Sequence, residues 1–252
     1  MTRQWLDEAL SATGLRGGQC FPRNLVLDLM ISLPMTVILL AAASTNAVRR
    51  WLADRGIEHE VSPGNRRLHG CLVAVGGKAI VFLDSDDDDK EQRFTLAHEI
   101  AHFILDHLVP RLRATTAFGE RIRQVLDAER EPTQDEMLSA VFERVPLGIH
   151  VHLMARGAHG EVCNWSVEES EQRADRLALE LIAPSQCATA SLRDVLDEPD
   201  NSQDLALQRD QAAHHLSERF GLPLHAAASY ADLLLAKETE RPRLSEELFG
   251  KH

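Results

Sequence analysis

The sequence predicts an α+β fold that is mainly helical, with a small antiparallel sheet and a helical segment at the C-terminus. Several long stretches carry apolar residues every three to four positions, which is the period of an amphipathic helix. Two short apolar runs, Cys71 to Val75 and Ala79 to Leu83, are joined through Gly76-Gly77 and predict a β-hairpin. With 252 residues and 44% hydrophobic composition, the chain can bury a sizeable core.

The N-terminal part is expected to hold a short leading segment, residues 1–24, and then a buried apolar element. The first residues lack the charged-then-apolar pattern of a secretory signal, because acidic residues interrupt it. The stretch from Leu25 to Ala43 approaches the length of a membrane span, but Asp28, Ser32 and Pro34 interrupt it. We therefore expect a core element here and no membrane anchor.

The net charge and the cysteine pattern argue against nucleic-acid binding and against a zinc-ribbon or disulfide-rich protein. The formal net charge is -12, from 39 acidic and 27 basic residues. Sequence-independent binding of nucleic acid needs Lys and Arg to neutralise phosphates, so we expect no direct nucleic-acid contact. The cysteines are far apart and include no Cys-x-x-Cys pair, which fits neither a zinc ribbon nor a dense disulfide framework. They are Cys20, Cys71, Cys163 and Cys187. Reduced thiols and a cytoplasmic location are the expectation.

A helix is predicted over about 45–55, because Ser44 can cap its start and Gly56 stands where helix ends favour a left-handed residue. After the hairpin, the tract from Asp84 to Asp89 is a polar loop that places negative charge before a long helix over about 91–108. A cation site is the alternative for this tract, but the tract lacks the glycine and the distant Glu of a calcium loop.

The remaining elements follow from the same periodicity and from punctuation by Gly and Pro. We predict helices over about 117–128, 134–144, 167–182, 205–220 and 224–236, and a strand around Ile149 to Met154. A polar linker near 194–204 precedes the last two helices, which loosely resemble a helix-turn-helix around Gly221-Leu-Pro. Their acidic composition favours a packing or partner-docking module over a DNA-binding one. Residues 191–252 are thus assigned to a C-terminal helical segment.

The segment His98-Glu99-Ile100-Ala101-His102 is an H-E-x-x-H motif inside an unbroken helical pattern. His98 and His102 lie one turn apart on the same helix face, so both imidazoles can reach one metal ion. Glu99 is rotated by about 100° from His98, which keeps it out of the ligand set but close to an attacking water. The pattern predicts a metal centre with Glu99 as base. Two core histidines beside a surface Glu are the alternative.

A catalytic zinc usually has three protein ligands and one open position, so another ligand is needed. His107 does not fit the third-histidine spacing of the metzincins. Asp106 lies about 12 Å farther along the helix axis than His98, which is too far to close a site with both histidines. The third ligand must come from another helix.

The predicted helix over 167–182 supplies several carboxylates. Glu171 is the favoured ligand, and Glu168, one turn earlier, is the second choice. Asp175 lies one turn after Glu171 and can accept the free ring N–H of a ligating histidine. A charged, exposed helix face is the alternative interpretation of these acids.

Two blocks of sequence occur in the order expected of one family. The first is Arg93-Phe-Thr-Leu-Ala-His-Glu-Ile-Ala-His, and the second is Glu171-x-x-Ala174-Asp175-x-x-Ala178-x-x-Leu181-Ile182-x-Pro184. Together they resemble the ImmA/IrrE family of bacterial metallopeptidases over roughly residues 25–185. Leu177 departs from the pattern, because the family usually has Phe there. By motif position, the resemblance makes His98, His102 and Glu171 the zinc ligands and Glu99 the catalytic acid.

The resemblance implies a zincin-like metallopeptidase domain over residues 25–190. The two blocks are farther apart than in compact members, so we expect an insertion over about 110–160 at the rim of the active-site cleft. The implied cofactor is zinc, with Mn2+ or another divalent ion as the alternative.

The implied function is an endopeptidase with a single protein target, a helix-turn-helix transcriptional repressor. The alternative is a non-catalytic regulator or toxin–antitoxin component that binds a partner and has a structural or vestigial metal. Glu99 favours catalysis, because a structural site needs no base. The donor that stabilises the oxyanion stays open among His150, His152, Arg173 and Tyr230.

Overall fold

The computed structural model of the protein describes residues 4–14, 20–57, 61, 64–127, 129–137, 150–155, 165–196 and 205–239. The chain forms two compact units. The first unit consists of residues 1–19 and 24–181 and contains the sheet and the helix of the H-E-x-x-H motif. The second unit consists of residues 20–23 and 182–252, and its described elements are helices.

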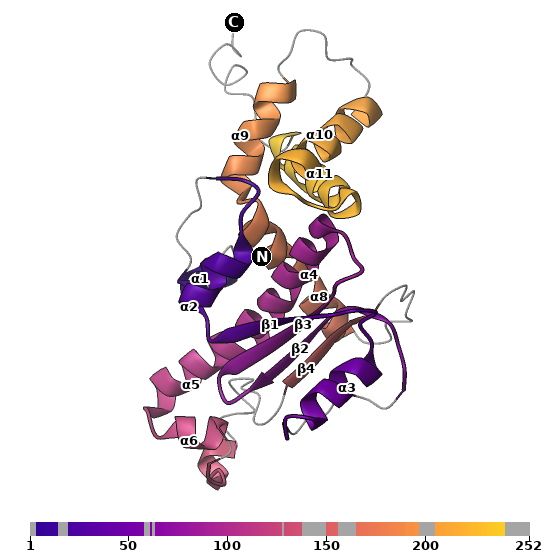
Figure 1. Ribbon diagram of the computed structural model, residues 1–252. Helices are drawn as coiled ribbons and strands as arrows, with labels where there is room; N and C mark the ends of the chain where they lie inside the picture. Colours follow the sequence, from indigo (N-terminus) through magenta and orange to yellow (C-terminus); the bar gives the residue numbers. More distant parts are fainter. Residues whose placement is uncertain are drawn as a thin grey trace, which may run out of the picture. The chain divides into compact units, whose positions relative to one another are not determined.

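Helices and a four-stranded sheet together confirm the α+β class (Figure 1). In chain order, the first unit contains α1 (Gln4–Thr13), α2 (Leu25–Ser32), β1 (Met35–Leu40), α3 (Thr45–Ala53), β2 (Leu68–Val75), β3 (Lys78–Asp84), α4 (Asp89–His102), the π-helix η1 (Phe103–Leu108), α5 (Val109–Phe118), α6 (Ile122–Leu126), β4 (His150–Ala155) and α8 (Trp165–Ile182). The last residue of α8 belongs to the second unit, which continues with α9 (Ser185–Leu196), α10 (Leu205–Phe220) and α11 (Leu224–Thr239).

The sheet has the strand order β1-β3-β2-β4 and is built around the predicted hairpin. Strands β2 and β3 are antiparallel, and Val75 pairs with Lys78 across the turn. Gly76 and Gly77 have φ of 55° and 75°, as a two-residue hairpin turn with two left-handed residues requires. Strand β4 pairs antiparallel with the other side of β2, in agreement with the predicted strand.

The apolar stretch from Leu25 to Ala43 divides into α2 and β1. Strand β1 pairs in parallel with β3, with Met35 opposite Ala79. The sheet is therefore mixed, and the prediction of a purely antiparallel sheet is wrong. The chain makes α3 and β2 between these two strands, and a parallel pair needs such a crossover. Among the helices of the described part of the chain, none is both long and apolar enough to cross a membrane.

Helices cover both faces of the sheet (Figure 1). Helix α3 begins at its predicted cap, where the Ser44 hydroxyl accepts the N–H of Ala47 at 3.3 Å. It packs in a core cluster that includes Val48, Leu52, Leu68, Cys71, Val73 and Phe82. On the other face lies α4, which is buried from Phe94 to His102. The motif helix is therefore a central element of the first unit.

The chain continues from α4 without a break, which differs from the predicted helix bounds. The π-helix η1 leads directly into α5, where Pro110 is the second residue and has no main-chain N–H to donate to the preceding turn. Gly119, with φ of 77°, ends α5, and only the short α6 follows in place of the predicted helix over 117–128. Residues 134–137 are helical, and the rest of the helix predicted to residue 144 lies outside the described residues.

In the second unit, α10 and α11 pack against each other across Gly221, which has φ of 68°. The Tyr230 ring is fully buried, and its hydroxyl donates to the Ala183 carbonyl at 2.9 Å. The Ser217 hydroxyl donates to the Leu222 carbonyl at 2.8 Å, which ties the end of α10 to the turn. The predicted helix pair is thus present.

Candidate metal centre

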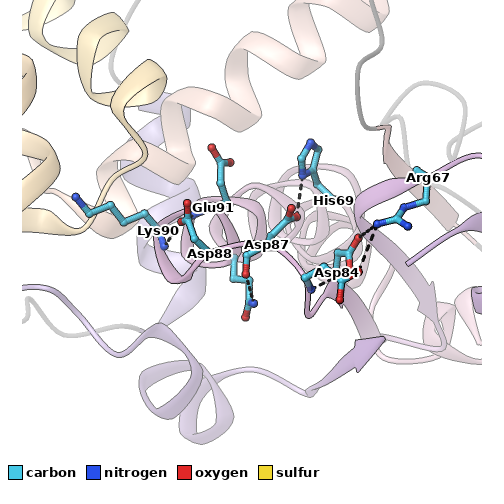
Figure 2. Close-up of polar contacts among 9 residues, drawn as sticks. Arg67, His69, Asp84, Asp87, Asp88, Lys90 and Glu91 are labelled. Carbon is cyan, nitrogen blue, oxygen red and sulfur yellow. Dashed lines mark hydrogen bonds and ion pairs between the residues drawn. The ribbon is translucent and has the colours of Figure 1, made fainter. Parts of the chain in front are cut away.

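The acidic tract before α4 fixes the start of the motif helix. The Asp88 side chain accepts hydrogen bonds from the main-chain N–H groups of Lys90 and Glu91, both at 2.9 Å, and so caps α4. Figure 2 shows the neighbouring Asp87 carboxylate directed at His69, with 2.8 Å between the Asp87 oxygen and His69 Nδ1. The cap and this contact anchor the N-terminal end of α4 to β2.

Asp84, at the end of β3, is fully buried and forms an ion pair with Arg67 at 3.1 Å (Figure 2). Its second carboxylate oxygen accepts the N–H of Asp86 at 3.1 Å. Within the described ranges, one group of side chains is arranged to hold a metal ion, and it does not include this tract. The structural interpretation of the tract is therefore favoured over a cation site.

The group that could hold a metal ion consists of His98, His102 and Glu171. The two Nε2 atoms are 3.2 Å apart, and Glu171 Oε2 is 3.3 Å from His98 Nε2 and 3.6 Å from His102 Nε2. The histidines come from α4 and are almost completely buried, whereas Glu171 comes from α8 and its side chain is 39% exposed. The structure thus brings together the three predicted ligands.

This donor set fits a catalytic zinc ion. Two imidazole nitrogens and one carboxylate oxygen are typical zinc ligands, and three protein ligands leave a fourth position open for water. The ring orientation agrees, because both Nε2 atoms face the Glu171 carboxylate while both Nδ1 atoms have other partners. His98, His102 and Glu171 would therefore hold the ion.

Each histidine has its own carboxylate at Nδ1. Asp175, as expected from the sequence, lies 2.8 Å from the Nδ1 of His98. Asp106 lies 2.8 Å from the Nδ1 of His102, a contact that was not predicted from the sequence. A carboxylate that accepts the Nδ1–H leaves the Nε2 lone pair free for a cation. The available signal for Asp106 was its spacing of four residues from His102 on one helix.

Without a bound cation, the centre favours the protonated, positively charged form of the His98 imidazole. Burial of His98 disfavours the charged form, but the hydrogen bonds to Asp175 and Glu171 outweigh burial and raise the pKa of His98 from 6.5 to about 9. The nearby Glu99 carboxylate adds to this shift. Protons and a cation consequently compete for the same ring nitrogen.

Glu99 follows His98 on α4 and is fully buried. Its carboxylate is not among the three grouped ligand atoms, which agrees with the role predicted for it. Strand β2 approaches it so closely that a Cβ placed on Gly70 would lie 3.0 Å from Glu99 Oε1 and 2.5 Å from Thr95 Cγ2. Only glycine leaves this space for the Glu99 side chain, and no local sequence signal indicates the contact.

Other residues named from the sequence have different partners. The Arg173 guanidinium lies over the Trp5 ring, 4.8 Å from its centre, and so packs α8 against α1. The Tyr230 hydroxyl is engaged within the second unit, and Glu168 accepts a bond from Gln172 Nε2 at 3.4 Å. His150 and His152 lie on β4, and their side chains are outside the described structure.

An H-E-x-x-H helix whose histidines converge with a glutamate of a second helix, in an α+β fold, defines a metallopeptidase-type centre. Residues 57–136 match the family described as the IrrE N-terminal-like domain, Peptidase_M78. The resemblance to the ImmA/IrrE family is thereby confirmed. The matched range includes the hairpin and α4 but ends before α8 and Glu171. Comparison with curated proteins and with solved structures finds no significant match.

Proposed function

We propose that the protein is a zinc-dependent metallo-endopeptidase in which Glu99 is the general base. The observation that carries the proposal is the convergence of His98, His102 and Glu171 beside a buried glutamate that is not itself a ligand. A structural metal site needs four filled positions and no base, whereas this arrangement offers three ligands and a base.

In amide hydrolysis, His98, His102 and Glu171 would hold the metal ion, and Glu99 would transfer the proton. A bound zinc ion supplies Lewis-acid chemistry, since it lowers the pKa of water and polarises a carbonyl. Glu99 takes one proton from the attacking water through a carboxylate oxygen as the new C–O bond forms. It then delivers this proton to the leaving amine nitrogen as the C–N bond breaks, and so returns to its ionised form.

The surroundings of Glu99 suit this role. Its burial against β2 holds the carboxylate in place and excludes bulk water from its inner side. Asp175 and Asp106 hold the two imidazoles, so that the ligand nitrogens and the base have fixed relative positions.

We further propose that the substrate is a protein, namely a helix-turn-helix transcriptional repressor. The support is the resemblance to the ImmA/IrrE family, whose members act on such repressors and are often encoded beside them. The α10–α11 pair is proposed as a partner-docking module, and we propose a cytoplasmic site of action.

Incubation of the purified protein with a repressor encoded next to its gene tests this function, with products identified by mass spectrometry. Wild type is expected to cut the repressor at one site, and Glu99→Gln to leave it intact while it keeps its metal. Cleavage by Glu99→Gln at the wild-type rate would rule out the assigned base. An intact repressor with zinc-loaded wild type would rule out that target.

A further inference from the structure

The segment that follows the H-E-x-x-H motif is a π-helix, and it begins directly after His102. Its widened hydrogen-bond pattern is seen where the Val109 N–H donates to the carbonyl of Ile104, five residues earlier. π-Helical turns are rare in proteins, and those that occur are frequently located at functional sites. This one lies directly beside His102 of the metal centre.

The π-helix contributes to two side-chain pairs with a spacing of four residues, one of which includes His102 at the end of α4. Phe103 and His107 are both fully buried, and their rings stack with centres 5.5 Å apart and an interplanar angle of 25°. The neighbouring pair is His102 and Asp106, with 2.8 Å between Nδ1 and the carboxylate oxygen. The same π-helix thus carries both the buried ring of His107 and the carboxylate that contacts His102.

We propose that Asp106 is a positioning residue of the metal centre, which holds His102 in the tautomer that binds metal. Neutral imidazole carries one proton and can place it on either ring nitrogen. A carboxylate at Nδ1 stabilises the form with Nδ1–H, so the Nε2 lone pair points at the other ligands. This inference rests on the proposed metal centre.

The two histidines are held from different directions. Asp175 reaches His98 from α8, whereas Asp106 reaches His102 from the continuation of the same helix. The α8 helix also supplies Glu171, so movement of α8 would release one ligand and the partner of another. Asp106 keeps the second imidazole oriented whatever the position of α8, and its side chain is 31% exposed, which leaves it two-thirds covered.

Zinc affinity of purified variants tests the proposal. Asp106→Ala removes the carboxylate, while Asp106→Asn keeps an oxygen that can accept the Nδ1–H but removes the charge. Asp89→Asn is the matched control, because it removes one negative charge at the opposite end of the same helix. The zinc dissociation constant is measured by competition with a chelator, the ligand geometry by the visible spectrum of the cobalt-substituted protein, and folding by the melting temperature in excess chelator.

We expect Asp106→Ala to weaken zinc binding about 10- to 100-fold and to change the cobalt spectrum. Asp106→Asn should retain part of the affinity, and Asp89→Asn should behave as wild type. The melting temperatures in chelator should differ little, because a positioning role concerns the ligand and not the fold. Wild-type affinity in Asp106→Ala, with a normal cobalt spectrum, would overturn the proposal while leaving the metal centre intact. A wild-type protein that binds no divalent ion would overturn both.

Discussion

Replacement of Gly70 by alanine tests the close approach of β2 to α4. The added Cβ would lie 2.5 Å from Thr95 Cγ2 and 3.0 Å from Glu99 Oε1. Thr95 and Glu99 are 1% and 0% exposed, so neither side chain can turn into solvent. Overpacking of this kind costs about 1–3 kcal/mol. We expect Gly70→Ala to lower the free energy of unfolding by this amount, as measured by urea denaturation of the zinc-loaded protein.

A second substitution separates the clash from other effects. Thr95→Ser deletes the methyl group closest to the added Cβ, and alone it should cost about 0.8 kcal/mol for one buried carbon. In the double variant the shortest contact is absent. The combined loss of unfolding free energy should therefore be smaller than the sum of the two single losses by at least about 0.5 kcal/mol.

Activity should respond differently from stability. In the double variant the added Cβ still lies 3.0 Å from Glu99 Oε1 and 3.2 Å from Glu99 Cγ, so the base remains displaced. We expect peptidase activity to stay low although stability partly returns, and zinc content to equal that of wild type. Additive losses of stability together with unchanged activity would refute the argument that Gly70 makes room for the base.

Three further predictions concern the side chains of His98, Cys71 and Tyr230. The pKa of His98 in the folded protein is raised from 6.5 to about 9, so this group stabilises the metal-free protein fully below pH 6.5 and loses that contribution between pH 6.5 and 9. The urea midpoint of metal-free protein should therefore fall over this pH range. Asp175→Asn should make the fall smaller. Burial, together with the nearby Glu99 carboxylate, holds the pKa of the Cys71 thiol well above its ordinary value. Mass spectrometry should therefore show far slower alkylation of Cys71 than of the exposed Cys20. Tyr230→Phe should lower the free energy of unfolding by about 1–3 kcal/mol, because a buried carbonyl loses its donor, while zinc content stays unchanged.

Local sequence signals predicted the parts of the structure that depend on local chemistry. The Ser44 cap, the Gly76-Gly77 turn and the spacing of the two motif histidines each constrain only a few neighbouring residues. The face shared by Glu171 and Asp175 follows from helical geometry in the same way. Such features can be predicted because helix and turn geometry fix them before tertiary packing.

Features that depend on distant parts of the chain could not be predicted in this way. The parallel pairing of β1 with β3 depends on a crossover, and the Arg173–Trp5 contact joins helices from opposite ends of the first unit. The π-helix arises from a shift in backbone hydrogen bonding, for which the residues from Phe103 to Leu108 carry no evident signal. The contact of Asp106 with His102, by contrast, has the local signal of a four-residue spacing.

The most direct test of the metal centre is elemental analysis of purified wild type, Glu171→Ala, Glu168→Ala and Glu99→Gln. Glu168 is the matched control, since it is a carboxylate one turn from Glu171 on α8 that bonds Gln172 instead. The account predicts near-equimolar zinc in wild type, Glu168→Ala and Glu99→Gln, and loss of zinc in Glu171→Ala. Full zinc content in Glu171→Ala, or none in wild type, would contradict it.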